Sequence, residues 1–326
     1  MVLAVTLLID QSFYGTLTVP PVRFLYLNIM QDLAVFYGRN RVDYYFTEGL
    51  PLLLITALPF AAVGMWSALR PGPDRPRFAG YAQRQTVHIL ALVVVTTVLA
   101  FSMIAHKEMR FIYPLLPILH VLAAKPLAHF FRPFPRPRSY FRFGLLVLGL
   151  AANIYIAAYV STIHQRGVID VMHYLRHEAE NESGVRNITV GFLMPCHSTP
   201  WRSHLVHPEI DAWALTCEPP INVAREARPD YLDEADVFYL DPGAWINNNM
   251  ADRKAVLKSV GSGTHGKIDD IRRPWPEYLV FFEHLEPVMN TLLERTRYEE
   301  CWRGFNTHWH DDGRRRGDVV VRCLRE

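Results

Sequence analysis

The chain has 326 residues, enough for two domains, and its formal charge at neutral pH is only +2. A charge this small gives no overall attraction to nucleic acid, so the sequence does not indicate a nucleic-acid-binding protein. The mean hydropathy of +0.04 conceals a division, because apolar runs dominate before residue 165 and mixed charge dominates after it. We therefore predict a membrane region over 1–165 and a water-soluble domain over 166–326.

The N-terminal part does not contain a clean membrane span. Residues 1–9 are apolar but too short to cross a bilayer alone, and they lack the basic start and cleavage site of a signal peptide. We expect them to be a partial span, the end of a helix whose beginning is missing. Residues 10–49 carry many charged side chains, yet apolar residues recur at helical spacing over 24–37. This pattern predicts a helix lying in the membrane interface.

Four later runs are apolar enough to cross a hydrocarbon core of about 30 Å. The predicted spans are 50–69, 87–105, 109–128 and 143–163. Pro114 and Pro117 interrupt the third run, so a broken or re-entrant segment is the alternative to a full span in which Lys125 extends to the interface.

Two arginine-rich connectors, 70–86 and 129–142, indicate the orientation. Their basic residues, opposed only by Asp74, are Arg70, Arg75, Arg77, Arg84, Arg132, Arg136, Arg138 and Arg142. Short basic loops stay in the cytosol. Counting spans then predicts that residues 10–49, 105–110 and everything after 164 lie on the luminal side.

Two glycosylation sequons, at Asn181 and Asn187, fall in the segment that this count places in the lumen. All four cysteines are in the same segment: Cys196, Cys217, Cys301 and Cys323. An oxidising lumen permits disulfides, and proximity favours pairing the first with the second and the third with the fourth, among three possible connectivities. Four reduced core thiols are the alternative.

The segment after 165 has a mixed α/β pattern. Short β-rich runs bounded by turn residues predict strands at 187–194, 237–240, 278–282 and 318–323. Helical periodicity predicts helices at 168–179 and 286–296. Strands separated by long connections indicate a small sheet with helices packed on it.

Ionisable side chains gather in a short turn between two predicted spans, in the motif His106-Lys-Glu-Met-Arg-Phe111. Charges at a membrane boundary are costly unless they serve the interface or a site. One interpretation is that they only anchor two helix ends among the headgroups. The other is a phosphate site, in which Lys107 and Arg110, three apart on one helical face, neutralise a lipid phosphate leaving group while His106 donates a hydrogen bond.

Two other groups have suggestive residue types. His308 and His310, followed by two aspartates, have metal-like spacing, but two histidines at i and i+2 are more typical of a surface turn, so we predict no metal site. The run Arg314–Arg316 suits anionic lipid, while a solvated turn is the simpler interpretation.

The motif at 106–111 resembles the signature of glycosyltransferase family 22, whose mannosyltransferases belong to the GT-C superfamily. Within it, Glu108 and Phe111 match motif positions. Three earlier segments follow the order and spacing of that family: Asp10-Gln-Ser-Phe-Tyr-Gly15, Phe36-Tyr-Gly38 and Tyr44-Tyr-Phe-x-x-Gly-Leu-Pro51. Later segments resemble the members that build the glycosylphosphatidylinositol (GPI) anchor: Met194-Pro-Cys-His-Ser-Thr-Pro-Trp201, residues 211–219, and residues 297–303 through His308-Trp-His-Asp-Asp312. The resemblance covers nearly the whole chain.

This resemblance implies the C-terminal part of a GT-C fold: a polytopic α-helical membrane protein followed by a soluble luminal mixed α/β domain, in the endoplasmic reticulum. It implies transfer of the third mannose, in α-1,2 linkage, from dolichyl phosphate mannose to the GPI precursor lipid, with inversion and without a metal or other cofactor. His106, Lys107 and Arg110 would then face the donor phosphate. A carboxylate base is needed for the acceptor hydroxyl. The family carries that base in its first luminal loop, and we expect this chain to begin after it, so neither Asp10 nor Glu108 is assigned as the base.

Three alternatives share the predicted topology: a catalytically incomplete fragment, a noncatalytic membrane scaffold and a transporter. A transporter is typically marked by charges or Gly/Pro breaks near the middle of several spans. Here the charges concentrate at one turn, which disfavours a transporter. An enzyme differs from a scaffold in having cations and a carboxylate that converge on a cavity open to lipid.

Overall fold

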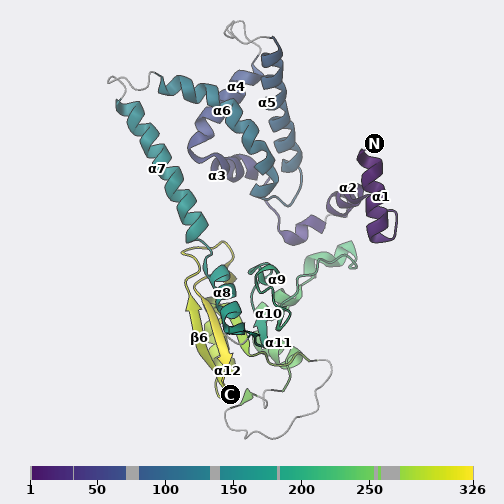
Figure 1. Ribbon diagram of the computed structural model, residues 1–326. Coiled ribbons are helices and arrows are strands. Elements are labelled where there is room, and N and C mark those ends of the chain that lie inside the picture. The colour runs from purple at the N-terminus through teal and green to yellow at the C-terminus, as the bar shows by residue number, and fades with distance from the viewer. Residues whose placement is uncertain are drawn as a thin grey trace. The chain divides into compact units, whose positions relative to one another are not determined.

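The computed structural model describes residues 2–31, 33–70, 81–132, 140–181, 184–252, 256–257 and 272–325. The chain forms two compact units (Figure 1). The membrane unit comprises Met1–Tyr155 with Pro220–Arg225, and the sheet unit comprises Ile156–Pro219 with Glu226–Glu326. Several residues used to predict topology lie outside the described residues: Asp74, Arg75, Arg77, Arg136, Arg138 and Ser183 of the first sequon.

The N-terminal part of the membrane unit consists of short helical pieces. Helix α1 (Val2–Tyr14) is followed by α2 (Pro20–Leu25), a π-turn η1 (Tyr26–Met30) and a 3₁₀ turn η2 (Leu33–Tyr37). The single interfacial helix predicted over 24–37 is therefore wrong. The Asn28 side chain donates to the Phe24 carbonyl at 2.8 Å, which is the acceptor that the Asn28 amide would use in an α-helix. The Asn28 side chain thus occupies the carbonyl that its own backbone amide would use, at the point where the α-helix becomes a π-turn.

Four described helical segments are long and apolar enough to cross a membrane: Tyr45–Leu69, Arg84–Ser102, Met109–Phe131 and Tyr140–Ala179. The chain is a polytopic membrane protein. The first segment joins η3 (Tyr45–Gly49), α3 (Leu50–Leu54), η4 (Ile55–Ala57) and α4 (Leu58–Leu69). The others are α5 (Tyr81–Ser102), η5 (Met109–Leu115) with α6 (Leu116–Phe131), and α7 (Tyr140–Thr162), which leads into α8 (Gly167–Ala179). Pro114 lies inside the 3₁₀ turn η5, and Pro117 in the first turn of α6, where its missing N–H costs nothing.

Helices α4, α5 and α6 pack closely through small residues. Ala61, Ala68 and Ala91 are buried in their common core. At Gly64 a Cβ would lie only 2.1 Å from the Leu122 carbonyl oxygen, so glycine is required for the approach of α4 to α6. Small residues that let helix backbones approach are typical of membrane packing.

The sheet unit contains a five-stranded sheet in the order β4-β3-β5-β7-β6. The strands are β3 (Ile188–Phe192), β4 (Ile210–Ala214), β5 (Tyr278–Phe282), β6 (Tyr298–Gly304) and β7 (Val319–Leu324). Strand β3 is parallel to β4 and β5, whereas β7 is antiparallel to β5 and β6. A separate two-stranded ribbon joins β1 (Glu180–Asn181) to β2 (Gly184–Val185).

Alternating side chains of the sheet fill two cores. On one face Val280 and Val321 pack with α8 and with residues next to α9 (Trp201–His204). On the other face Phe281 and Val320 pack with α10 (Glu234–Leu240), α11 (Pro242–Asn249) and α12 (Glu286–Leu293). The sheet unit is thus a three-layer α/β structure, in which β5 is buried on both sides.

One predicted strand is wrong, since residues 237–240 end helix α10. The Asp233 side chain caps that helix by accepting from the Asp236 amide at 2.7 Å, and Ala235 and Phe238, three residues apart, are buried. The sequence analysis also missed β4 and β6. Strands β4 and β6 are the two edges of the sheet, and the exposed Glu299 and Glu300 of β6 interrupt the apolar alternation that is typical of an inner strand.

Candidate functional site

The polar turn, residues 103–108, connects α5 to η5 and is not helical. Two bends of the chain meet here, because the Asn40 amide donates to the Ala105 carbonyl at 3.0 Å. The prediction that Lys107 and Arg110 share one helical face is therefore wrong: Lys107 precedes the 3₁₀ turn and Arg110 lies within it.

Lys107 is buried, with only 3% of its surface exposed. Its ammonium donates to the Ile104 carbonyl at 2.7 Å and to the Asn40 carbonyl at 3.4 Å, and its amide donates to the Asn40 side chain at 2.8 Å. Burial, together with the nearby charge of Arg39, lowers the Lys107 pKa. The ammonium therefore holds the two segments together from inside the turn.

Glu108 connects the two other cations of the motif. Its carboxylate accepts from His106 Nε2 at 2.9 Å and from the guanidinium of Arg110 at 2.7 Å. Burial raises the Glu108 pKa, but the hydrogen bonds from His106 and Arg110 outweigh it, so the net pKa is lowered and the group stays ionised. The Arg110 side chain is 68% exposed, which makes it the accessible cation of the motif.

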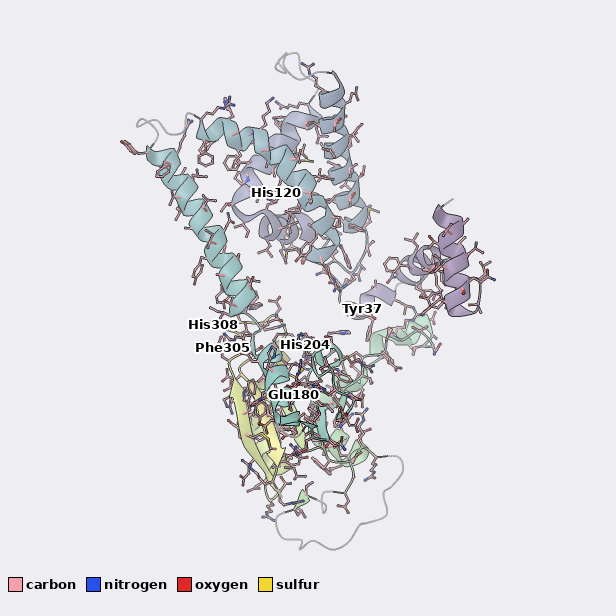
Figure 2. The ribbon with its side chains drawn as sticks, in the orientation of Figure 1. Tyr37, His120, Glu180, His204, Phe305 and His308 are labelled. Carbon is pink, nitrogen blue, oxygen red and sulfur yellow. A yellow bond between two sulfur atoms is a disulfide. The ribbon has the colours of Figure 1, made fainter. Side chains whose placement is uncertain are left out.

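His106 is held between two acceptors. Its Nδ1 lies 3.2 Å from the Gly38 carbonyl, and its Nε2 faces the Glu108 carboxylate. Each ring nitrogen of His106 therefore lies within hydrogen-bond distance of an oxygen acceptor. Gly38 has φ +112°, a conformation that favours glycine, and this conformation presents its carbonyl to the ring. The ring of Tyr37, labelled in Figure 2, lies 6.0 Å from the His106 ring.

Residues 38–45 brace the turn, and only Gly38, Tyr44 and Tyr45 among them lie in the segments that carry the family resemblance. Besides Gly38 and Asn40, the buried Tyr45 donates through its hydroxyl to the Glu108 carbonyl at 3.3 Å. Phe111 packs near His106, with ring centroids 6.1 Å apart. Asp10 lies in α1, and no contact with the polar turn is described for it. The signal that could have identified Asn40 and Tyr45 is their place inside or beside the quoted segments.

An apolar cavity of about 240 Å³ lies among the helices of the membrane unit. Phe46, the neighbour of Tyr45, lines its wall, and residues of α3, α4, α5 and α6 line the rest, among them Leu54, Met65 and Val98. One wall residue of the cavity, Phe46, thus directly follows a residue that is hydrogen-bonded to the polar turn.

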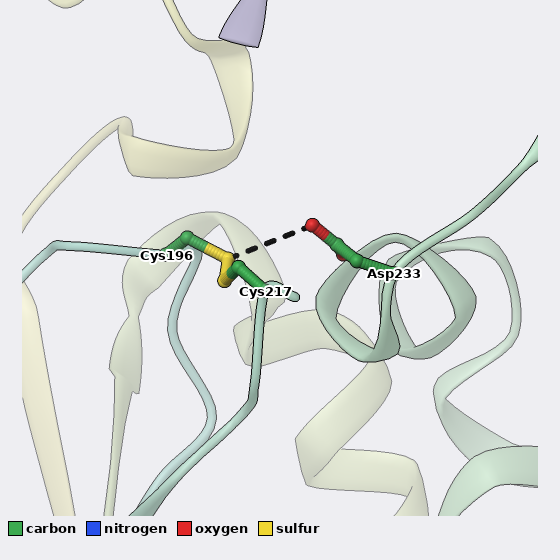
Figure 3. A group of neighbouring side chains, drawn as sticks. All are labelled: Cys196, Cys217 and Asp233. Atoms are coloured by element: carbon green, nitrogen blue, oxygen red, sulfur yellow. Dashed lines mark hydrogen bonds between the residues drawn. A yellow bond between two sulfur atoms is a disulfide. The ribbon is translucent and has the colours of Figure 1, made fainter. Parts of the chain in front are cut away.

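A second cluster surrounds the disulfide Cys196–Cys217, which joins the segments that follow β3 and β4 (Figure 3). Asp233 Oδ2 lies 3.8 Å from Cys196 Sγ, and burial raises the pKa of this carboxyl. The three side chains converge as metal ligands would, but the two sulfurs are bonded to each other and cannot act as thiolates. The cluster is structural.

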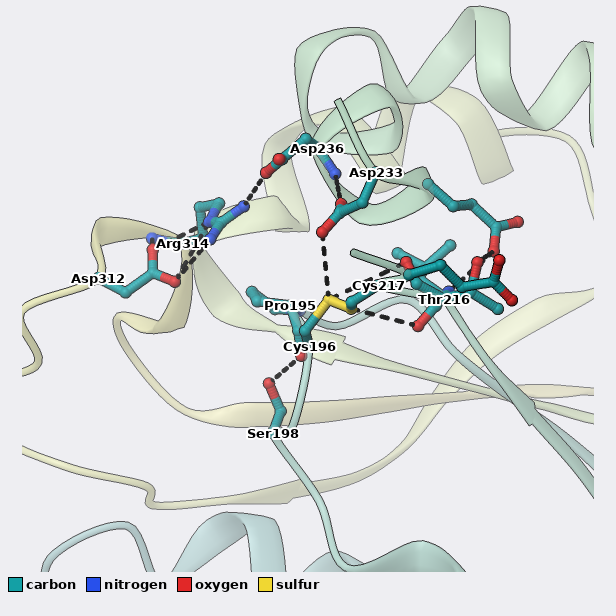
Figure 4. The surroundings of a disulfide bond; sticks show 12 residues. Pro195, Cys196, Ser198, Thr216, Cys217, Asp233, Asp236, Asp312 and Arg314 are labelled. Carbon is teal, nitrogen blue, oxygen red and sulfur yellow. Dashed lines mark hydrogen bonds and ion pairs between the residues drawn. A yellow bond between two sulfur atoms is a disulfide. The ribbon is translucent and has the colours of Figure 1, made fainter. Parts of the chain in front are cut away.

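The run Arg314–Arg316 is not a solvated turn. Arg314 binds Asp312 and Asp236, each at 3.0 Å, beside the disulfide (Figure 4). Arg315 donates to the Cys196 carbonyl at 2.5 Å. Arg315 therefore stabilises the loop that carries Cys196, while Arg314 links η10 (Gly313–Arg315) to helix α10.

The remaining predicted residues lie in the sheet unit. Cys301 and Cys323 form the second disulfide, across β6 and β7, so both disulfides are the pairs that proximity favoured. Asn187 is exposed directly before β3, and Asn181 ends β1. His308 Nδ1 lies 2.8 Å from the Tyr159 hydroxyl, and His310 accepts from the Asp312 amide at 3.0 Å.

Comparison with known proteins identifies the family. The model of the Alg9-like mannosyltransferase family matches residues 1–206. The chain belongs to the Alg9-like mannosyltransferase family. It is 45% identical to GPI mannosyltransferase 3 of Aspergillus fumigatus, over 99% of this chain and 45% of that protein. It is 40% identical to GPI mannosyltransferase 3 of Yarrowia lipolytica (98% of this chain, 56% of that protein) and 32% identical to human GPI alpha-1,2-mannosyltransferase 3 (94% and 47%).

The chain spans about half the length of the curated Alg9-like relatives it matches. No solved structure matches it. The part of this chain that the family model matches includes the polar turn, Arg110 and the segment that braces the turn.

Proposed function

We propose that this chain forms the donor-binding part of a membrane mannosyltransferase that transfers the third mannose of the GPI anchor, in α-1,2 linkage, from dolichyl phosphate mannose to the GPI precursor lipid. The observation that carries the proposal is the polar turn, where one accessible guanidinium, Arg110, is held by Glu108 at the end of two membrane helices. No metal or other cofactor is invoked.

In this proposal the phosphate of the donor binds Arg110. The leaving group is dolichyl phosphate, and fixed cations lower the energy of the charge that develops on it. A guanidinium suits this task, because its planar N–H groups bind two phosphate oxygens at once. His106, which contacts the same Glu108 carboxylate, and the buried Lys107 ammonium stabilise the turn on which Arg110 sits.

The polyprenyl chain of the donor would occupy the apolar cavity. Phe46 lines this cavity, and the preceding residue, Tyr45, is hydrogen-bonded to the polar turn. A phosphate bound at Arg110 would therefore have an apolar space beside it for its lipid tail. We make no assignment of the carboxylate base.

We further propose that the polar turn and the sheet unit lie in the lumen of the endoplasmic reticulum. Two disulfides in the sheet unit and the exposed Asn187 support an oxidising compartment that also glycosylates proteins. Endoglycosidase digestion of the chain from a eukaryotic host tests this. A mass shift that is reduced in Asn187→Gln or Asn181→Gln supports the lumen, and glycosylation of sequons inserted at Arg70 or Arg132 instead would contradict it.

Complementation tests the activity. Yarrowia lipolytica cells lacking their own GPI mannosyltransferase 3 would receive this chain alone, or this chain joined to the part of the Yarrowia protein that it does not match. Surface GPI-anchored protein is the readout. Rescue by the joined protein is expected, and correct expression without rescue by either form would reject the proposal.

A further inference from the structure

A loop of the sheet unit closes around the end of helix α7. This aromatic loop comprises residues 305–309, between β6 and η10, and Figure 2 shows Phe305 and His308 at the C-terminal end of α7. His308 bonds to the Tyr159 hydroxyl at 2.8 Å, and the two rings are stacked with centroids 5.9 Å apart. The loop is therefore attached to the last turn of the apolar helix.

Three further contacts fix the loop where α7 passes into α8. Thr307 Oγ1 lies 2.9 Å from His164 Nδ1, the Asn306 carbonyl accepts from the Arg166 amide at 3.1 Å, and Asn306 and Thr307 are buried. At Gly167 a Cβ would lie 2.9 Å from the Phe305 carbonyl oxygen, so the backbones touch. The loop cannot swing away from the helix end without breaking these contacts.

The aromatic loop nevertheless exposes its two largest apolar side chains. Trp309 is 60% exposed and Phe305 is 42% exposed. Val160 and Ile163, from the end of the helix, are also exposed. A fixed loop with large exposed aromatic rings needs a partner that removes them from water.

The membrane helix determines which partner this is. With 23 residues, α7 is about 34 Å long, slightly more than a hydrocarbon core of about 30 Å. Tyr159 lies in its last turn, so a loop bonded to Tyr159 is at the level where the helix leaves the hydrocarbon. Trp and Tyr concentrate at that level, because their rings are apolar and their N–H or O–H groups remain hydrated.

We propose that the aromatic loop is a membrane-interface anchor, with Trp309 and Phe305 inserted among the lipid headgroups of the leaflet in which α7 ends. The partner is the lipid surface itself, contiguous with the lipid that surrounds the helix. The nearby Arg166 forms an ion pair with Asp170 at 2.7 Å. The proposed anchor therefore depends on its aromatic rings and not on a cation that binds anionic lipid. It is independent of which sugar the enzyme transfers.

Spin labels in phosphatidylcholine nanodiscs test this inference with the full chain. All four native cysteines are paired, so Trp309→Cys and Phe305→Cys each introduce a single free thiol for a nitroxide. Leu240→Cys is the matched control, because Leu240 is an apolar side chain on α10 that is 71% exposed. All three replacements remove exposed side chains and should leave the fold intact.

Dissolved oxygen concentrates in lipid, whereas a charged nickel chelate stays in water. Collisions with oxygen should exceed those with the chelate at 305 and 309, and the ratio should reverse at 240. Labels at 305 and 309 that meet the chelate as often as the label at 240 would overturn the inference. Labels shielded from both reagents would also overturn it, because protein would then cover the loop.

Discussion

Replacing Lys107 should destabilise the chain more than the same replacement of Arg110, although the two lie in one motif. In Lys107→Met the Ile104 carbonyl loses a 2.7 Å bond inside a buried site, which costs about 1–3 kcal/mol. The second bond, at 3.4 Å, adds little, and removing a buried charge offsets part of the loss. In Arg110→Met the lost ion pair is 68% exposed on the arginine side, so the expected cost is below about 1 kcal/mol.

Thermal unfolding in detergent would measure both variants. At about 2–4 °C per kcal/mol for a unit of this size, Lys107→Met should melt roughly 2–12 °C lower, with Arg110→Met close to the unmodified chain. Equal or larger destabilisation by Arg110→Met would refute this division of roles. It would mean that the exposed guanidinium, and not the buried ammonium, holds the turn.

Three further changes test the packing of each unit. Gly64→Ala forces α4 away from α6 and should cost about 1–3 kcal/mol by thermal unfolding, whereas Gly144→Ala, with open space around it, should not destabilise. Replacing Cys301 and Cys323 by serine opens a loop of 22 residues and should cost about 3 kcal/mol, and an unchanged melting temperature would argue against that bond. Burial raises the folded-state pKa of Asp233, so the folded chain favours the protonated carboxyl. The stability that this protonated group contributes is fully present below its ordinary pKa and is lost as pH rises through the raised pKa. Asp233→Asn keeps the helix cap and stays neutral, so its stability relative to the unmodified chain should increase as pH rises from the ordinary pKa to the raised one. Melting temperatures of the two chains that change in parallel with pH would contradict this.

The membrane region was predictable because its signal is one of composition. Uncharged runs of about twenty residues need no partner to be recognised, and the described helices contain them. The start of the first span at Tyr45 was not predictable, since Glu48 lies inside it and Tyr45 enters the core through its bond to the polar turn.

Local pattern was insufficient where long-range contacts decide the structure. Residues 237–240 have β propensity, but they end a helix whose Ala235 and Phe238 pack in one core with Phe281 and Val320 of the sheet. Lys107 and Arg110 have helical spacing, yet the Lys107 amide is hydrogen-bonded to the side chain of Asn40, 67 residues away, in a turn that is not helical. The charged motif is therefore visible in the sequence as a group, but its spacing does not separate the buried Lys107 from the exposed Arg110.

The central claim is that the exposed guanidinium of Arg110 binds the donor phosphate. The most direct test is mannose transfer from dolichyl phosphate mannose by membranes that contain the joined protein, with and without Arg110→Met. Losing one preorganised cation should lower the transfer rate by about 10²-fold or more while the melting temperature stays close to that of the unmodified protein. An unchanged transfer rate in a folded Arg110→Met protein would contradict the claim and leave the polar turn as an interfacial anchor of two helices.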